Sequence, residues 1–162
     1  MLVSALVLGL VAGVVTGGDL RRLARVRIRA LPLLLAAGAL RVIGLFFALP
    51  VLVYTVVLAL LVIVALLNRH VPGALLATVG IALNLVVIAL NGGMPVDAAA
   101  AQSVGVELKD DGLHIPLSSA TVLPFLADVI PAHVFRNLYS VGDIVLAGSG
   151  FWIVFRLLRR PH

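Results

Sequence analysis

The chain has 162 residues, of which 62% are hydrophobic and 12% charged, and its mean hydropathy is +1.22. Soluble domains are about 45–50% apolar and about 25% charged, so the composition indicates an integral membrane protein, whose length fits a single domain over residues 1–162. Cysteine is absent, which excludes disulfides and thiolate sites, and the net charge of +5 comes from arginines beside apolar segments, a pattern typical of membrane topology and not of nucleic-acid binding.

Five apolar segments predict five membrane-spanning helices. They cover residues 1–16, 31–49, 51–67, 71–90 and 138–158. A spanning helix needs about 20 residues, with a range of about 17–25, so the first and third segments are short. Pro50 divides an apolar run that is too long for one crossing, because proline removes a backbone donor and ends helices. The first segment is expected to be an uncleaved span, because its positive charges follow the apolar stretch instead of preceding it.

Arginine placement predicts the orientation. Arginines follow the first, third and fifth spans: Arg21, Arg22, Arg25, Arg27, Arg29, Arg69, Arg156, Arg159 and Arg160. Five crossings put all of them on one side, which the positive-inside rule makes cytoplasmic. The N-terminus is then outside the plasma membrane and the C-terminus inside. The arginines of 21–29 are expected to fix this orientation; the alternative is binding of anionic lipid headgroups, worth about 1 kcal/mol per basic residue.

Residues 91–137 form the one long loop, which this topology places outside the membrane. Alternating apolar residues in 104–108 and 113–117, with a turn at 109–112, predict a β-hairpin. Ser119 or Thr121 is expected to cap a short helix through Leu126. The predicted fold is therefore an all-α membrane protein with five transmembrane helices and a small extracytoplasmic cap, made of a short hairpin and a helical turn.

Asn91, Gly92 and Gly93 begin this loop, and glycine allows positive φ and close backbone approach. A helix C-cap followed by a turn is the favoured interpretation; the alternative is that Asn91 faces a site. Asn84 lies seven residues earlier on the same helix face. It is expected to bond a neighbouring helix, an interaction worth about 0.6 kcal/mol.

Arg41 lies near the middle of the second predicted span, where a charge costs about 2.5–3.5 kcal/mol. Such residues face the interior of the protein and pair with another group. Asp143 is the expected partner. The alternative is that the side chain reaches toward the outer surface.

Asp128 and Asp143 stand at the outer end of the last span. Ser140 and Asp143 have the spacing of a capping box, in which each side chain binds the backbone amide of the other. However, the apolar run that follows Asp143 is short, so spanning draws the carboxylate below the outer surface, where desolvation raises an aspartate pKa. A structural cap and a buried functional carboxyl both remain open.

The pattern of the whole chain resembles a bacterial family of small integral membrane proteins, a domain of unknown function. The motifs that carry the resemblance are Gly17-Gly18 before the arginine loop, Asn91-Gly92-Gly93-Met94-Pro95-Val96, Thr121, Leu126-Ala127-Asp128-Val129-Ile130-Pro131 and Ser140-Val141-Gly142-Asp143. This resemblance implies no activity.

Residues 126–150 are also similar to the C-terminal part of lipoprotein signal peptidases, which are membrane aspartyl proteases. Asp128 and Asp143 match the two aspartates of that family, which implies a pair of carboxyls that share one proton and activate a water. The sequence departs from that family's pattern in three ways. Ser140 and Gly142 replace an asparagine and an alanine, five spans replace four, and an Asn-x-x-Asp-Arg element is missing.

Two functions follow as hypotheses. The first is a non-catalytic module that binds or assembles with other membrane components through its outer loop. The alternative is an outward-facing membrane aspartyl hydrolase. The expected partners are the lipid bilayer, other membrane proteins or a lipid-linked substrate, with no nucleic acid and no cofactor. His114 and His133 with Asp128 lack the close ligand spacing of a metal site, so no metal is expected.

Overall fold

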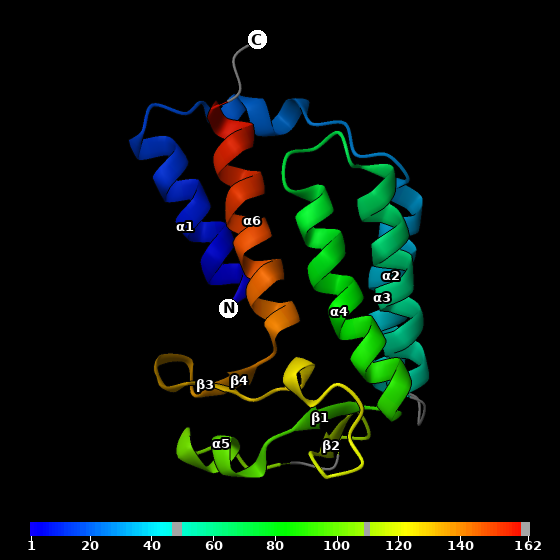
Figure 1. Ribbon diagram of the computed structural model, residues 1–162. Coiled ribbons are helices and arrows are strands. Elements are labelled where there is room, and N and C mark those ends of the chain that lie inside the picture. The colour runs from blue at the N-terminus through cyan, green and yellow to red at the C-terminus, as the bar shows by residue number, and fades with distance from the viewer. Residues whose placement is uncertain (47–49, 109–110, 160–162) are drawn as a thin grey trace.

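The apolar segments form five helices in the computed structural model, which describes residues 1–46, 50–108 and 111–159. The helices are α1 (Leu2–Val15), α2 (Leu31–Ile43), α3 (Pro50–Leu67), α4 (Ala74–Asn91) and α6 (Val141–Arg159). They run alternately in opposite directions (Figure 1). The helices α3, α4 and α6 have 18, 18 and 19 residues and are apolar enough to cross a membrane. The helices α1 and α2 are shorter, with 14 and 13 residues. The prediction of a mostly helical protein is confirmed, and three of its helices are long and apolar enough to cross a membrane.

The five helices pack in the order α1, α6, α4, α3, α2, each mainly against its neighbours in that row. The arrangement is thus an open row. Glycines permit its closest contacts. A Cβ atom at Gly80 of α4 would lie 2.7 Å from the backbone nitrogen of Leu146 in α6, and one at Gly9 of α1 would lie 2.6 Å from the carbonyl oxygen of Phe151. Small residues let membrane helices approach in this way.

Most of the arginines gather at one end of the row. The helix η1 (Leu20–Arg25) lies across that end, where α3 and α6 also finish (Figure 1). Asn68 attaches the segment that follows η1: its Oδ1 accepts from the Arg29 amide at 2.8 Å, and its Nδ2 donates to the Arg29 carbonyl at 2.9 Å. Arg160, which we assigned to the same cluster, lies outside the described residues.

The opposite end of the row carries a layer of short elements, hereafter the loop layer, residues 92–140 (Figure 1). Its elements are β1 (Met94–Val96), α5 (Ala98–Ser103), β2 (His114–Pro116), η3 (Pro124–Leu126), β3 (Ile130–Ala132), η4 (His133–Phe135) and β4 (Asn137–Tyr139). Strands β1 and β2 pair in parallel, and β3 and β4 pair antiparallel. The apolar core lies where this layer meets α3 and α4, around Leu58, Val87, Ile88, Met94 and Leu126.

The predicted hairpin over 104–117 is wrong. Residues 114–116 do form a strand, but its partner is Met94–Val96 and the pairing is parallel. Gly93 allows this approach, because a Cβ atom there would lie 2.8 Å from the carbonyl oxygen of Leu113. An alternating pattern identifies a strand and not its partner. The expected turn includes residues 109 and 110, which lie outside the described residues, and the expected short helix is the single turn η3.

Candidate functional site

A cavity of about 300 Å³ lies where the helices meet the loop layer. Its walls come from the α1, α3, α4 and α6 helices and from the loop layer. The lining residues are Met1, Leu2, Tyr54, Asn84, Ile88, Met94, Leu113, His114, Asp128, Asn137, Leu138, Tyr139, Asp143 and Leu146. Small-molecule sites are concave and combine an apolar lining with a few convergent polar groups. This cavity has that composition, and it includes both aspartates that the sequence singled out.

Asp143 is held by a complete network of hydrogen bonds. The Ser140 amide donates to Asp143 Oδ2 at 3.2 Å, and the Asp143 amide donates to Ser140 Oγ at 3.0 Å, so the predicted capping box is confirmed. Asn84 Nδ2 donates to Asp143 Oδ1 at 2.8 Å, and Ser140 Oγ donates to Asn84 Oδ1 at 2.8 Å. Asn84 therefore joins α4 to α6, as expected of a polar residue in a spanning helix.

Gly142 makes this network sterically possible. A Cβ atom at that position would overlap the side-chain amide of Asn84. Ser140 is fully buried and Asn84 nearly so. The three polar side chains of the network thus hydrogen-bond one another at a point where α4 and α6 are too close for any residue larger than glycine at position 142.

Asp128 is in the opposite situation. Its backbone is fixed beside β1, since its amide donates to the Pro95 carbonyl at 2.9 Å and its carbonyl accepts from the Asp97 amide at 3.1 Å. Its side chain is only 9% exposed, and the carboxyl oxygen Oδ1 is buried without a hydrogen-bond partner. Burial, with a smaller effect from the negative charge of Asp143, raises the pKa of Asp128 to about 7.

The two aspartates line the same cavity although 15 positions separate them in the sequence. A purely structural pair was expected to show Asp143 bonded to Ser140, Asp128 bonded to loop amides and no shared cavity. The first expectation is met. The expected bonds from loop amides to the Asp128 side chain are not found within the described residues. The expected lack of a shared cavity is wrong. The geometry combines a capped, hydrogen-bonded carboxylate with a buried carboxyl that still has a free oxygen.

A second cavity of about 350 Å³ lies within the loop layer and shares four lining residues with the first: His114, Asp128, Asn137 and Leu138. Its other walls include Glu107 and Arg136. Asp128 therefore lies at the junction of two cavities. One lies between the helices and the loop layer, and the other lies within the loop layer.

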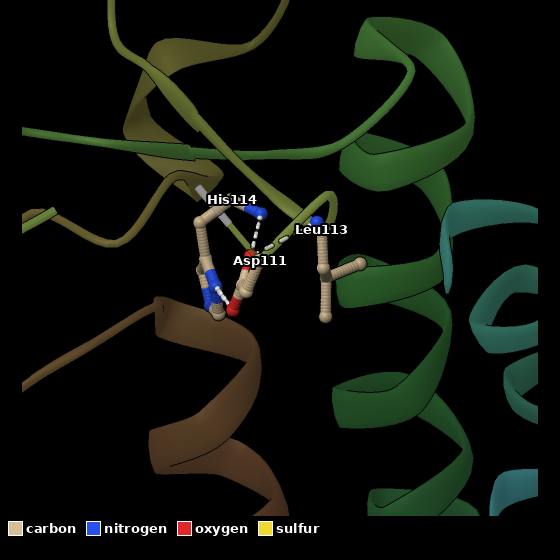
Figure 2. A network of polar contacts seen from close by, with 3 residues as sticks. All are labelled: Asp111, Leu113 and His114. Carbon is tan, nitrogen blue, oxygen red and sulfur yellow. Dashed lines mark hydrogen bonds and ion pairs between the residues drawn. The ribbon is translucent and has the colours of Figure 1, made fainter. Parts of the chain in front are cut away.

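His114 is held at this junction by Asp111. The Nδ1 atom of His114 lies 2.7 Å from Asp111 Oδ2, and Asp111 Oδ1 accepts from the amides of Leu113 and His114, both at 2.9 Å (Figure 2). Partial burial acts to raise the pKa of Asp111, but the two amides and the His114 ring outweigh it and lower the pKa to about 2. Asp111 thus fixes the position of His114, which lines both cavities.

The predicted pairing of Arg41 with Asp143 is wrong. The Arg41 guanidinium lies 5.3 Å from the centroid of the Tyr54 ring, and the described residues include no ion pair between Arg41 and a carboxylate. The reason is the order of the helices, which puts α3 and α4 between α2 and α6. Arg41 also lies in the last turn of α2 and is exposed, so the alternative of an arginine that reaches the surface fits better.

The remaining predicted residues hold the loop layer together and do not line the first cavity. Asn91 fastens Val122 to the end of α4: its Nδ2 donates to the Val122 carbonyl at 3.0 Å, and its Oδ1 accepts from the Val122 amide at 2.8 Å. Gly92 is the expected helix C-cap, with φ +67°. Thr121 accepts from the Ser118 amide at 2.9 Å in a local turn. The described residues contain no group of three metal-binding side chains around one point, and His133 lines neither cavity.

Three polar residues of the cavity wall were missed from the sequence: Tyr54, Asn137 and Tyr139. The signal for Tyr54 was present, because its hydroxyl interrupts an otherwise apolar helix one turn after Pro50. Asn137 and Tyr139 belong to β4, which pairs with β3 and brings both residues back toward Asp128. No local sequence pattern predicts this pairing of β4 with β3.

Comparisons with known proteins place the chain in a family. No curated protein and no solved structure matched it. The family of unknown function DUF5317 matches residues 23–155, which include both aspartates and all the loop layer. The likeness to lipoprotein signal peptidases thus rests on residues 126–150 of the sequence alone. Since the match covers most of the chain, this protein belongs to the family of unknown function DUF5317.

Proposed function

We propose that the chain is a five-span protein of the bacterial plasma membrane, with its N-terminus and loop layer outside the cell. The composition, the three long apolar helices and the separation of most of the arginines from the loop layer support this topology. The two shorter helices cross with local thinning of the bilayer, which costs fractions of a kcal/mol per ångström of mismatch.

Single cysteines test this topology, because the chain has none of its own. A cysteine at Ser118, in the loop layer, should react with an impermeant maleimide added to intact cells. A cysteine at Arg69, in the turn between α3 and α4, should react only after the cells are opened. Labelling of both sites from outside would overturn the five-span topology.

We further propose that the cavity binds a small amphipathic ligand with a cationic or hydrogen-bond-donating head group. One observation carries this proposal: Asp128 lines the cavity, and its carboxyl oxygen Oδ1 is buried without a hydrogen-bond partner among the described residues. An unsatisfied buried polar group costs about 1–3 kcal/mol, and a ligand that donates to it removes the cost. The walls mix apolar side chains such as Leu2, Ile88 and Leu146 with polar ones such as Asp128, His114 and Asn137. This mixed lining favours a ligand that has both apolar and polar parts.

Mass spectrometry of extracts from the purified protein tests the binding. Wild type and Asp128→Asn would be purified from native membrane in mild detergent, with Asp19→Asn as the control, since Asp19 is an exposed aspartate at the other end of the protein and lines neither cavity. We expect a compound that is enriched in wild type and in the control and depleted in Asp128→Asn. Identical extracts from all three proteins would contradict the proposal.

Aspartyl hydrolysis is the second candidate, and the shared cavity favours it. One carboxyl of such a pair must accept a proton from water while the other, protonated, polarises a carbonyl group. Asp143 accepts hydrogen bonds from Asn84 and Ser140 as a carboxylate does, whereas Asp128 has a pKa of about 7 and holds a proton more readily. The loop layer would then admit a lipid-linked peptide.

Hydrolysis of peptides that carry a lipid-modified residue tests this second candidate. Cleavage should be lost in Asp128→Asn and in Asp143→Asn and kept in Asp19→Asn. Because Asp143 also caps α6, the unfolding of each variant must be measured beside its activity. Cleavage that persists in Asp128→Asn would exclude the aspartyl mechanism, and ligand binding would still stand.

A further inference from the structure

A third hollow lies at the opposite end of the protein, among the arginines. It is an apolar groove of about 270 Å³, bounded by α3, α4, α6 and the segment between η1 and α2. Val26, Ile28, Ala65, Ala77, Ile153 and Leu157 are among its walls. Asn68 is a polar residue of the wall, and its amide is occupied by Arg29 and by the Val64 carbonyl. The groove therefore offers apolar surface to its occupant.

The rim of this groove is positively charged. Val26 and Ile28 contribute to the wall, while Arg25, Arg27 and Arg29, which alternate with them, are exposed. Arg69, also exposed, follows Asn68 at the start of the turn between α3 and α4. In the described part of the chain, no carboxylate lies within ion-pair distance of these four arginines.

We propose that this groove binds one anionic phospholipid, with an acyl chain between α3, α4 and α6 and its phosphate on the arginine rim. The charge of the rim selects the headgroup, because a basic residue at a membrane surface favours anionic lipid by about 1 kcal/mol. The apolar walls of the groove select a lipid over a soluble anion. This inference rests on the membrane topology proposed above and not on the cavity at Asp128.

Trp152 is the natural reporter of this site. It is the single tryptophan of the chain. A Cβ atom at Gly73 would lie 3.3 Å from Trp152 Cδ1 and 2.8 Å from Ile153 Cγ1, so the indole lies beside the groove. A lipid with bromine atoms in its acyl chain should quench Trp152 when it occupies the groove.

The experiment compares brominated phosphatidylglycerol with brominated phosphatidylcholine, each at increasing fractions in vesicles of unlabelled phosphatidylcholine that contain the whole protein. We expect phosphatidylglycerol to quench at lower fractions. The preference should fall about fivefold for each arginine removed, in Arg27→Gln and in Arg69→Gln. Arg136→Gln, which removes an arginine from the loop layer at the other end, should keep the full preference.

A groove-filling variant separates a bound lipid from general attraction to a charged surface. Ala65→Phe keeps every arginine and occupies the groove, so the preference should disappear. Far-UV circular dichroism must match wild type, and Ala65→Leu serves if the larger residue prevents folding. Equal quenching by the two lipids in wild type, or a preference that survives filling of the groove, would overturn the proposal.

Discussion

Replacing Asp128 with asparagine is expected to stabilise this protein at and above neutral pH. Burial, and to a lesser degree the charge of Asp143, raises the pKa of Asp128 from its ordinary 3.8 to about 7. One pKa unit corresponds to about 1.36 kcal/mol, so ionisation of this carboxyl in the folded protein costs about 4 kcal/mol of stability above pH 7. Asparagine has nearly the same shape and no charge, and it therefore avoids this cost.

The pH dependence follows from the direction of the change. Between pH 3.8 and about 7, the folded protein retains a proton that the unfolded chain has released. Folding stability should therefore fall as the pH rises through this range and should level off above it. In Asp128→Asn this slope should be absent, and the two proteins should differ most above pH 7.

Unfolding in mixed micelles, followed by Trp152 fluorescence between pH 4 and about 8, measures both effects. Asp111→Asn is the control, because Asp111 is exposed and its pKa is lowered instead of raised. The reasoning fails if wild-type stability does not change over this range. It also fails if Asp128→Asn is the less stable protein at the alkaline end, since that would mean that the Asp128 carboxylate makes a favourable contact.

Three further changes test the site and the packing around it. Asn84→Leu should cost about 1–3 kcal/mol in the same unfolding assay, because it removes the acceptor of the Ser140 hydroxyl and the donor to Asp143 Oδ1. Thr78→Ala should cost much less, because the Thr78 hydroxyl bonds a carbonyl of its own helix. Gly142→Ala should cost about 1–3 kcal/mol through overlap with Asn84, whereas Gly148→Ala, which meets open space, should show no loss of thermal stability. The turn at Asp111 is stabilised by the ionised carboxylate above the ordinary pKa of 3.8, and it loses that contribution as the pH falls toward 2. The protection of the Leu113 and His114 amides from hydrogen exchange, measured against the intrinsic rate at each pH, should therefore fall over that interval. In Asp111→Asn this protection should be low at every pH.

The capping box shows what the sequence could predict about the site. Ser140 and Asp143 lie three positions apart, and their reciprocal bonds follow from helix geometry alone. The role of Asn84 followed from the cost of a polar group in an apolar span. In each case the physical rule acts within one helix or on one residue.

Arg41 and the strand at 114–116 show what could not be predicted. The pairing of Arg41 with Asp143 required α2 to lie beside α6, and the sequence contains no signal for the order in which the helices pack. The strand was recognised from its alternation, but its partner at 94–96 depends on the close approach that Gly93 permits. Long-range neighbours are decided by tertiary packing, which local patterns do not encode.

The contrast between the two aspartates bears on function. Asp143 has a sufficient structural role, because it caps α6 and joins it to α4, and nothing about its contacts requires a ligand. Asp128 has no such role for its side chain: the backbone of the residue holds β1 in place, and asparagine would preserve those bonds. Its carboxyl lowers stability at neutral pH and has a buried oxygen without a partner, in a residue that lines a cavity. Proteins accept local strain and unsatisfied groups mainly at functional sites. Asp128 is therefore the residue on which both proposed functions depend, and the cavity that it lines is the place to search for a ligand.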